Sequence, residues 1–322
     1  MKIVLFDPHG HRGELQAALA AFPDISVVNA ADTAALRTAL PQAEILIASN
    51  RSYTAEPAAA IRECGGALRW IQFSTSGIDT AVASGLPPGV IVTNAAGLRA
   101  FAVAEHAFAL MLGLVRHLGA TERARQDAVW LREAITPAMD NLAGKHLVLV
   151  GLGAIGQEIA RKAKAFDMQV TGISRATAPM ADIDRIRPRN ELHAAAAQAD
   201  ILLLALVYDA ETDKILSRGV IQAMKPTAYV INIARGRLVD EAALIDALRA
   251  GKLAGAGLDV TETEPLPAGH PFWTMPNVLL TPHLGGTGSK SGGGGFSKIF
   301  LDNLRRWQRG EPLTKVVIKR TA

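Results

Sequence analysis

The sequence is poor in cysteine, in aromatic residues and in long hydrophobic runs. Its 322 residues include one cysteine, Cys64, and aromatic residues make up only 5%. A single cysteine cannot form an internal disulfide, which is typical of a reducing compartment and predicts a cytoplasmic protein. The longest uninterrupted apolar run, residues 201–208, is far too short to span a membrane, and the run at 3–6 is too short for a signal peptide. These shortages exclude a disulfide scaffold and a membrane-spanning protein. For Cys64, a position in the core or on a helix surface is favoured over a role as a catalytic thiol.

Neither sign of charge is in large excess. Lys and Arg number 34 against 30 Asp and Glu, which gives a net charge of +4 and a pI of about 9.3. The basic residues are spread along the chain, so they indicate a mildly basic surface or affinity for small anionic ligands, and not for nucleic acid. With 49% hydrophobic and 20% charged residues, the composition is that of a globular protein, and the length predicts about two domains.

Short apolar runs alternate with alanine-rich amphipathic segments from one end of the chain to the other. This rhythm predicts an α/β fold in which parallel sheets carry helices on both faces. A long helix at residues 101–117 is apolar on most of its faces, and only Glu105 and His106 interrupt that surface. Strands are expected at residues 3–6, 25–28, 45–48, 70–73 and 90–92, and in a second series at 146–150, 169–173, 201–207, 229–234, 255–260 and 278–281.

A glycine-rich turn opens the second series. The strand at 146–150 runs into Gly151-x-Gly153-x-x-Gly156, and a helix pattern starts at once. The first glycine allows a tight turn, the second lets a pyrophosphate approach the backbone, and the third lets helix and strand pack closely. In this strand-turn-helix context the pattern predicts dinucleotide binding; a tight turn without a ligand is the alternative.

The end of the next strand bears on which dinucleotide binds. An NAD site usually has an acidic residue there for the ribose 2′-hydroxyl, about 20 residues beyond the glycines. This chain has Ser174 and Arg175, and Ser174 lies 174 − 156 = 18 residues beyond Gly156. A serine and an arginine suit a 2′-phosphate, so NADP is favoured over NAD. The alternative is a surface arginine without a ligand.

Three charged residues follow three predicted strands of the second series. Arg235, Glu264 and His283 each come just after a strand end, and ligands of open α/β sheets bind at the carboxyl ends of the strands. Separately they could be a solvated arginine, a surface acid and a loop histidine. Together they can act as a reaction centre: an arginine binds a carboxylate, a histidine transfers a proton near neutral pH, and a carboxylate stabilises the charged histidine.

On these features the sequence resembles the D-isomer-specific 2-hydroxyacid dehydrogenases over nearly its whole length. That family includes glyoxylate/hydroxypyruvate reductases, phosphoglycerate dehydrogenase and D-lactate dehydrogenase. The resemblance is carried by Asn94-Ala-Ala-Gly97, Val103-Ala-Glu105-His106, the turn at 151–156, INIARGRLVDEAAL from Ile231, AGAGLDVTETEPLP from Ala254, TPHLGG from Thr281 and NLRRWQRGEPL from Asn303.

The resemblance implies a role for each reaction residue. Arg235 is the ligand of the substrate carboxylate and carbonyl, and His283 is the general acid/base. Glu264 is its partner, with Glu262 as the competing acid in this loop. The turn at 74–79 resembles the loop whose backbone amides bind the substrate carboxylate, and an ordinary strand-to-helix turn is the alternative. Its implied substrate contacts are Ser76 and Gly77.

The resemblance also implies a set of cofactor contacts and no metal. Asp259 is similar to the residue that contacts the nicotinamide carboxamide. The full set is Gly151, Gly153, Ala154, Ile155, Gly156, Ser174, Arg175, Ala234, Asp259, Gly285 and Gly286.

The family architecture implies two doubly wound parallel-sheet domains. Residues 1–95 and 287–322 are expected to form a discontinuous, flavodoxin-like substrate domain, and residues 96–286 a Rossmann-type cofactor domain, with a small 2-oxo or 2-hydroxy acid in the cleft. Family members are usually homodimers, which implies an interface at the long helix and the segment around Trp130.

Three segments depart from the family pattern. Residues 207–212 replace the usual proline-containing loop beside the cofactor, and the tail at 315–322 lacks the usual ending. Gly292 to Gly295 stand where a helix usually starts; because each glycine destabilises a helix by about 1 kcal/mol relative to alanine, a loop is expected there.

The activity that the resemblance favours is that of a glyoxylate/hydroxypyruvate reductase. A phosphoglycerate dehydrogenase-like activity and an NAD(H)-sensing co-repressor remain as alternatives. A formate dehydrogenase pairs its histidine with glutamine, so Glu264 argues against that class.

Overall fold

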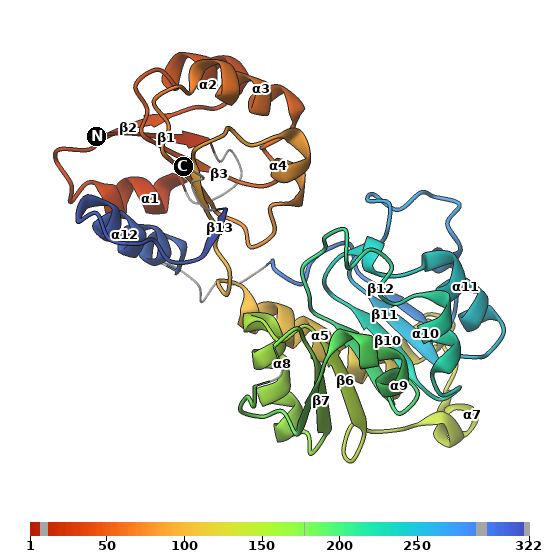
Figure 1. Ribbon diagram of the computed structural model, residues 1–322. Helices are drawn as coiled ribbons and strands as arrows, with labels where there is room; N and C mark the ends of the chain where they lie inside the picture. The colour runs from red at the N-terminus through yellow and green to blue at the C-terminus, as the bar shows by residue number, and fades with distance from the viewer. Residues whose placement is uncertain (7–11, 177, 288–294, 319–322) are drawn as a thin grey trace. The chain divides into compact units, whose positions relative to one another are not determined.

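The computed structural model describes residues 1–6, 12–176, 178–287 and 295–318. The chain divides into two compact units (Figure 1). Unit 1 comprises Met1–Leu98 and Lys290–Ala322, and unit 2 comprises Arg99–Ser289. The predicted boundaries after residues 95 and 286 lie three residues before those of the compact units, 98 against 95 and 289 against 286.

Unit 1 is built on a six-stranded sheet. Its order β13-β5-β4-β3-β1-β2 contains the flavodoxin-like order, with β13 added antiparallel at the edge beside β5. The other neighbouring strands pair in parallel. The strands are β1 (Lys2–Phe6), β2 (Ser26–Asn29), β3 (Ile45–Ala48), β4 (Trp70–Phe73), β5 (Ile91–Thr93) and β13 (Val316–Ile318).

Helices cover both faces of this sheet because its central strands are apolar on both sides. Along β1, Ile3 and Leu5 belong to one core cluster and Val4 and Phe6 to the other, which is the period of two expected for a strand. Residues of α2 (Thr33–Ala39), α3 (Ala55–Cys64) and α4 (Asp79–Ser84) complete one core, and those of α1 (Arg12–Leu19) and α12 (Gly295–Gln308) complete the other (Figure 1).

Unit 2 is built on a seven-stranded parallel sheet in the order β12-β11-β10-β9-β6-β7-β8. Numbered within the unit, this is the Rossmann order 3-2-1-4-5-6 with one further strand. The predicted fold, two doubly wound parallel sheets of Rossmann and flavodoxin type, is therefore confirmed. The strands are β6 (His146–Val150), β7 (Gln169–Ile173), β8 (Arg185–Arg187), β9 (Ile201–Leu204), β10 (Tyr229–Asn232), β11 (Gly255–Leu258) and β12 (Val278–Leu280).

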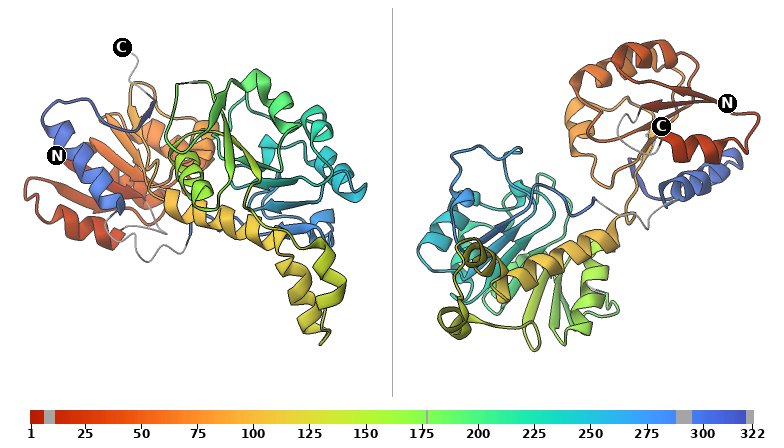
Figure 2. Two further views of the ribbon diagram at one scale, coloured as in Figure 1. Left: turned by 90° about the horizontal axis from the view of Figure 1, so that it is seen from below. Right: turned by 180° about the vertical axis from the view of Figure 1, so that it is seen from behind.

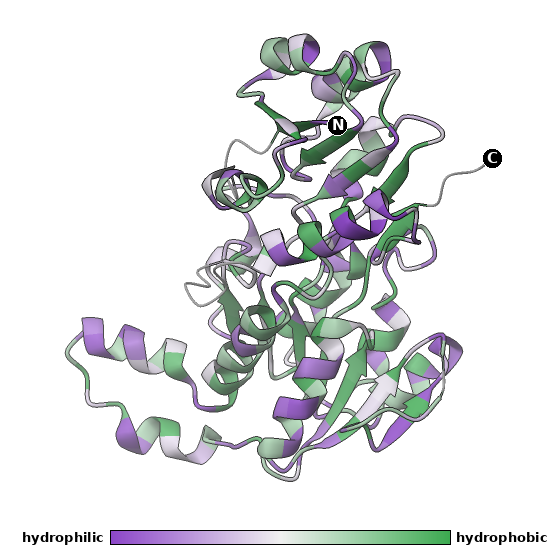
Figure 3. Cartoon of the chain, turned by 90° about the vertical axis from the view of Figure 1, so that its left-hand side faces the viewer, coloured by the Kyte–Doolittle hydropathy of each residue, from purple (hydrophilic) through white to green (hydrophobic). Residues whose placement is uncertain are grey.

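Two helical layers enclose this second sheet, and most of its strands are largely hydrophobic (Figure 3). One core contains residues of α5 (Ala100–Val115) and α8 (Ala154–Ala165). The other contains residues of α9 (Leu192–Ala196), α10 (Arg218–Ala223) and α11 (Glu241–Arg249). Single turns of 3-10 helix are η1 (Thr136–Ala138), η2 (Arg189–Glu191), η3 (Gly236–Leu238) and η4 (Pro271–Trp273).

The segment after α5 projects from the rest of unit 2 (Figure 2, left, in yellow). It contains α6 (Leu118–Gln126) and α7 (Arg132–Ile135), and Trp130 between them is 89% exposed. Within the described residues, no single helix is long and apolar enough to cross a membrane. Together, α5 and α6 meet that test of length and composition, but they are bent by 67°.

The structure corrects several predicted elements. Two short edge strands, β8 and β13, were not predicted. Strands β9, β10 and β11 end two or three residues earlier than expected. At the end of β10, the buried Asn232 side chain accepts a hydrogen bond from Ala234 N and donates one to Arg235 O, and these two bonds turn the chain out of the strand. The loop predicted at Gly292 to Gly295 is wrong at its last residue, since Gly295 opens α12; residues 292–294 lie outside the described residues.

Candidate active site

The glycine-rich turn lies between β6 and α8, as predicted. Gly151 has φ +102°, a backbone conformation that L side chains rarely adopt, and a Cβ at Gly156 would lie 2.1 Å from Gly151 O. A Cβ at Gly153 would meet nothing within 4 Å, so the space beside this residue is open. Gly153 caps α8, and the first-turn N–H groups of Ala154 and Ile155 follow it. These features fit a backbone cradle for a pyrophosphate.

Ser174 and Arg175 lie at the carboxyl end of β7, the neighbour of β6. Ser174 N donates to Arg187 O of β8 at 3.1 Å, and Ser174 Oγ accepts from Ala176 N at 3.3 Å. Arg175 is exposed. The loop thus presents a hydroxyl and an exposed cationic side chain next to the strand that ends in the glycine-rich turn, which fits an anionic group on a bound nucleotide.

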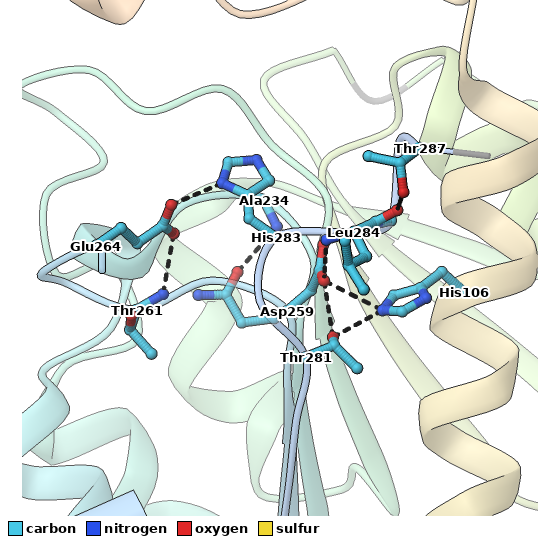
Figure 4. Close-up of polar contacts among 11 residues, drawn as sticks. His106, Ala234, Asp259, Thr261, Glu264, Thr281, His283, Leu284 and Thr287 are labelled. Carbon is cyan, nitrogen blue, oxygen red and sulfur yellow. Dashed lines mark hydrogen bonds and ion pairs between the residues drawn. The ribbon is translucent and has the colours of Figure 1, made fainter. Parts of the chain in front are cut away.

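The strands β10, β11 and β12 are neighbours, and the reaction residues follow their carboxyl ends. His283 Nδ1 lies 2.8 Å from Glu264 Oε2 (Figure 4). Glu264 Oε1 also accepts from Thr261 N at 3.3 Å. Glu262 is exposed, and its backbone N donates to Glu241 Oε2. Of the two acids in this loop, Glu264 is the one whose carboxylate contacts the histidine.

The surroundings of Glu264 change its acidity. Burial raises the pKa of this carboxyl, but the hydrogen bond and charge of His283, the Thr261 N–H and the charge of Arg235 together lower the pKa below its ordinary value of 4.5. The net direction is downward, so the carboxylate is ionised at neutral pH. An ionised carboxylate only accepts hydrogen bonds, so His283 Nδ1 carries the hydrogen of the contact with Glu264.

Arg235 stands in a turn that is packed tightly against the loop of Glu264. Its Nη1 donates to Ala234 O at 2.7 Å, and Asn232 Nδ2 donates to Arg235 O at 2.8 Å. A Cβ at Gly236 would lie 1.9 Å from the carbonyl carbon of Thr261, so only glycine allows this approach of the two backbones. This contact holds Arg235 and Glu264 on adjoining loops.

Asp259 is buried, with 3% of its surface exposed. Its Oδ1 accepts from Thr281 Oγ1 at 2.7 Å and from Leu284 N at 2.8 Å, and its Oδ2 accepts from Gly285 N at 2.9 Å (Figure 4). His283 N donates to Asp259 O at 2.8 Å, and His283 has φ +54°, a left-handed conformation that costs roughly 1–2 kcal/mol outside glycine. Asp259 therefore anchors the loop that carries His283.

The structure brings together most of the predicted residues of unit 2 at the carboxyl ends of neighbouring strands. Ser76 and Gly77 belong to unit 1, in the turn after β4. Thr75 Oγ1 donates to Gly77 O at 2.8 Å, and Asn94 Nδ2 donates to Ser76 O at 2.6 Å, so this turn is held internally. Their role as substrate contacts stays a prediction. Among the residues that the structure describes, no group of three or more His, Cys, Asp and Glu side chains is placed to hold a metal ion.

Sequence reasoning assigned no role to Asn232, Thr281 or His106. Asn232 is an amide in the middle of an apolar run, and Thr281 opens the motif that contains His283. His106 gave the clearest signal, because it interrupts an otherwise apolar helix; in the structure its Nε2 lies 2.8 Å from Thr281 Oγ1 and 3.2 Å from Asp259 Oδ1.

Comparison with known families agrees with this site. A model of the D-isomer specific 2-hydroxyacid dehydrogenase NAD binding domain matches residues 108–285, more than half of the chain. The chain belongs to the D-isomer-specific 2-hydroxyacid dehydrogenase family. It is accordingly an NAD(P)-dependent oxidoreductase.

Individual relatives extend the match. The glyoxylate reductase of Pyrococcus furiosus is 36% identical over 228 residues, which are 69% of this chain and 67% of the relative. The D-3-phosphoglycerate dehydrogenase of Methanocaldococcus jannaschii is 34% identical over 233 residues, 71% of this chain but 43% of the relative. A family member from Aeromonas salmonicida has a solved structure with a TM-score of 0.85, 28% identity and 98% coverage of both chains. One from Xanthobacter autotrophicus, solved with NADPH, has a TM-score of 0.82, 26% identity and the same coverage.

Replacing Glu264 by glutamine tests the carboxylate beside His283. The neutral amide cannot stabilise positive charge on the ring as the carboxylate does, so we expect a three- to tenfold lower kcat for reduction at about pH 8. In the wild type Glu264 is ionised above about pH 4.5, and its effect is lost as the pH falls through its lowered pKa. Kinetic pH profiles compare the two enzymes over this range and at about pH 8.

Glu262→Gln is the matched control, because Glu262 lies in the same loop and its side chain is exposed. It should reproduce the wild-type profile. A Glu264→Gln profile that coincides with the Glu262→Gln profile would remove the role assigned to the pair.

Proposed function

We propose that this enzyme reduces glyoxylate to glycolate and hydroxypyruvate to D-glycerate, with NADPH as the preferred cofactor. The observation that carries the proposal is the contact of 2.8 Å between His283 Nδ1 and Glu264 Oε2 on a loop packed against the turn of Arg235. Reduction of a 2-oxo acid needs a proton donor, a carboxylate that orients this donor, and a nearby cation that binds the substrate's carboxylate. His283, Glu264 and Arg235 provide these three groups.

The residues of unit 2 fit a nicotinamide dinucleotide. The open space at Gly153 and the amino-terminal turn of α8 would hold the pyrophosphate, and Ser174 and Arg175 the adenosine ribose with its 2′-phosphate. Ala234, Asp259, Gly285 and Gly286 stay predicted contacts of the nicotinamide end. When bound, the reduced cofactor supplies the hydride that forms the new C–H bond at the substrate's carbonyl carbon.

The chain's own side chains do the rest of the proposed chemistry. The Arg235 guanidinium binds the substrate carboxylate through paired N–H groups and polarises the neighbouring carbonyl. As the C=O π electrons move onto oxygen, His283 donates a proton to that oxygen. Its Nδ1 faces Glu264, so Nε2 is the nitrogen that gives the proton (Figure 4). Glu264 orients the ring and stabilises its charged form; oxidation of the hydroxy acid reverses these steps.

A rate matrix tests the proposed substrates. Glyoxylate, hydroxypyruvate, pyruvate and 3-phosphohydroxypyruvate are each assayed with NADPH and with NADH. The proposal expects the highest kcat/KM for glyoxylate or hydroxypyruvate with NADPH. Preference for the phosphorylated acid would favour the phosphoglycerate dehydrogenase-like alternative, and cofactor binding without turnover on any acid would favour the co-repressor alternative.

Replacing Arg175 by alanine tests the cofactor preference. Loss of a cation that binds the 2′-phosphate should raise the KM for NADPH about tenfold or more and leave the KM for NADH nearly unchanged. Arg185→Ala is the matched control, because Arg185 is an exposed arginine at the opposite, amino-terminal end of the neighbouring strand β8. An equal change for both cofactors, or a strong NADH preference of the wild type, overturns this part of the proposal.

We also propose a homodimer that uses the long helix α5 and the segment that follows it. Its support is the exposure of large apolar side chains on both, 63% for Phe101 in α5, and 57% for Leu118 and 89% for Trp130 in the projecting segment. Sedimentation of the 34.0 kDa chain should give about twice that mass, and Trp130→Ala should shift the equilibrium toward the monomer. Trp273→Ala, at a tryptophan that is 54% exposed elsewhere in the unit, should not. A monomeric wild type contradicts the proposal.

The cytoplasmic location and the substrate contacts of Ser76 and Gly77 remain predictions.

A further inference from the structure

A histidine on the long helix is connected to the loop of His283 by a partly buried chain of hydrogen bonds. His106 of α5 has its Nε2 2.8 Å from Thr281 Oγ1 and 3.2 Å from Asp259 Oδ1 (Figure 4). The His106 side chain is 20% exposed and that of Asp259 only 2%. The contact joins residues 175 positions apart in the chain, so it ties α5 to the strand ends β11 and β12.

The donors and acceptors in this cluster can be assigned from their chemistry. An ionised carboxylate only accepts, so the single hydroxyl hydrogen of Thr281 points to Asp259 Oδ1 at 2.7 Å. Thr281 Oγ1 then has only lone pairs to offer His106. Nε2 must therefore carry a hydrogen, which it shares between the hydroxyl and the carboxylate.

Asp259 passes this constraint on to the loop of His283. Its two carboxylate oxygens accept from the N–H groups of Leu284 and Gly285, the two residues that follow His283. His283 N itself donates to Asp259 O, and its backbone is left-handed. The orientation of the Asp259 carboxylate thus sets where the backbone after His283 lies, and the N–H of His106 is one of the donors that set that orientation.

We propose that His106 is a positioning residue of the dehydrogenase, which holds the loop of His283 in its reactive geometry through Asp259 and Thr281. The inference rests on the proposed function, because it assigns His106 to the proton-transfer step. His106 does not itself touch the reacting atoms. Its role requires the N–H at Nε2 and not the ring as such.

The same unit contains a matched control contact. His146 Nε2 lies 2.8 Å from Thr171 Oγ1, the same distance and the same pair of residue types. His146 is the first residue of β6, at the amino-terminal end of the sheet, away from the strand ends that carry the reaction residues. A change at His146 therefore removes a histidine–threonine hydrogen bond without touching the loop of His283.

The test compares His106→Leu, His106→Gln and His146→Leu in the full-length protein. A glutamine amide reaches about as far as the imidazole Nε2 and can donate, whereas leucine cannot. We expect His106→Leu to lower kcat for the best 2-oxo acid about 10- to 100-fold with KM changed less than about threefold, because a misplaced proton donor slows the chemical step more than binding. His106→Gln should recover most of the rate, and His146→Leu should keep it within about twofold.

Hydrogen exchange of the peptide that contains Leu284 and Gly285 is a second readout, and it needs no activity. These amides should exchange faster in His106→Leu than in the wild type, and they should be unchanged in His146→Leu. If the wild type reduces no 2-oxo acid, the proposed function fails, while the exchange rates still decide whether His106 orders the loop. A His106→Leu enzyme that matches His146→Leu in kcat and exchange overturns the inference, and so does a His106→Gln enzyme as slow as His106→Leu.

If His106→Leu does not fold, Thr281→Val removes the same link at its other end, with Thr281→Ser as the variant that restores the hydroxyl. The expected results are the same loss in kcat for valine and recovery for serine. Thr171→Val is the control. A Thr281→Val enzyme with the kcat and exchange rates of Thr171→Val also overturns the inference.

Discussion

Replacing His283 by alanine is expected to lower kcat for glyoxylate and hydroxypyruvate about 100- to 10,000-fold, because a positioned general acid contributes a factor of that size. The alanine cannot donate a proton to the carbonyl oxygen, and water must take over at that position. Cofactor binding should change little, since the proposed phosphate contacts lie in the glycine turn after β6 and in the loop after β7, whereas His283 follows β12. Steady-state kinetics and fluorescence titration with NADPH measure the two quantities separately.

His193→Ala is a suitable control for this substitution. His193 lies in the short helix α9, outside the predicted site, so its loss should leave kcat near the wild-type value. If His283→Ala kept a near-wild-type kcat on every active 2-oxo acid, the assignment of His283 as the general acid would be wrong.

Replacing Arg235 by glutamine should reduce kcat/KM by about 100- to 1,000-fold, which corresponds to about 3–4 kcal/mol of lost transition-state stabilisation. The guanidinium is expected both to bind the carboxylate and to stabilise the negative charge that develops on the carbonyl oxygen. Arg235→Lys keeps the charge but not the paired N–H geometry, so it should recover only part of the loss. The contrast between the two variants separates charge from geometry.

Arg237→Gln controls for a general effect of charge near the site. Arg237 is two residues away, its side chain is 57% exposed, and it pairs with Asp213 and stacks over Tyr208. Its replacement should change kcat/KM by less than about threefold. Equal losses of kcat/KM in Arg235→Gln and Arg237→Gln would mean that Arg235 contributes only positive charge near the site and does not bind the substrate directly.

Much of the fold could be predicted because its strands are buried on both faces. Such strands are largely apolar, and the strands predicted at 45–48, 70–73, 146–150 and 169–173 coincide with β3, β4, β6 and β7. The candidate site could be predicted for a related reason. In a parallel sheet, residues that follow strand ends gather at one edge, so Arg235, Glu264 and His283 were expected together before their contacts were known.

The elements that could not be predicted depend on tertiary contacts. Strand β8 carries two arginines around one isoleucine and has no apolar run. Strand β13 is an apolar run of only three residues, and its antiparallel pairing with β5 depends on a contact across the chain. The role of His106 depends on Thr281, 175 residues later, and no local pattern shows that pairing. The choice between Glu262 and Glu264 likewise needed the geometry of the loop, because the two acids stand on either side of Thr263 and the sequence alone does not show which one faces His283.

The configuration of the product tests the central claim most directly. Hydroxypyruvate is reduced with NADPH, the oxidised cofactor is counted, and the glycerate is resolved on a chiral column. The account predicts D-glycerate, one molecule for each NADPH oxidised. L-Glycerate, or NADPH binding without reduction of hydroxypyruvate, glyoxylate or any other 2-oxo acid in the matrix, would contradict it.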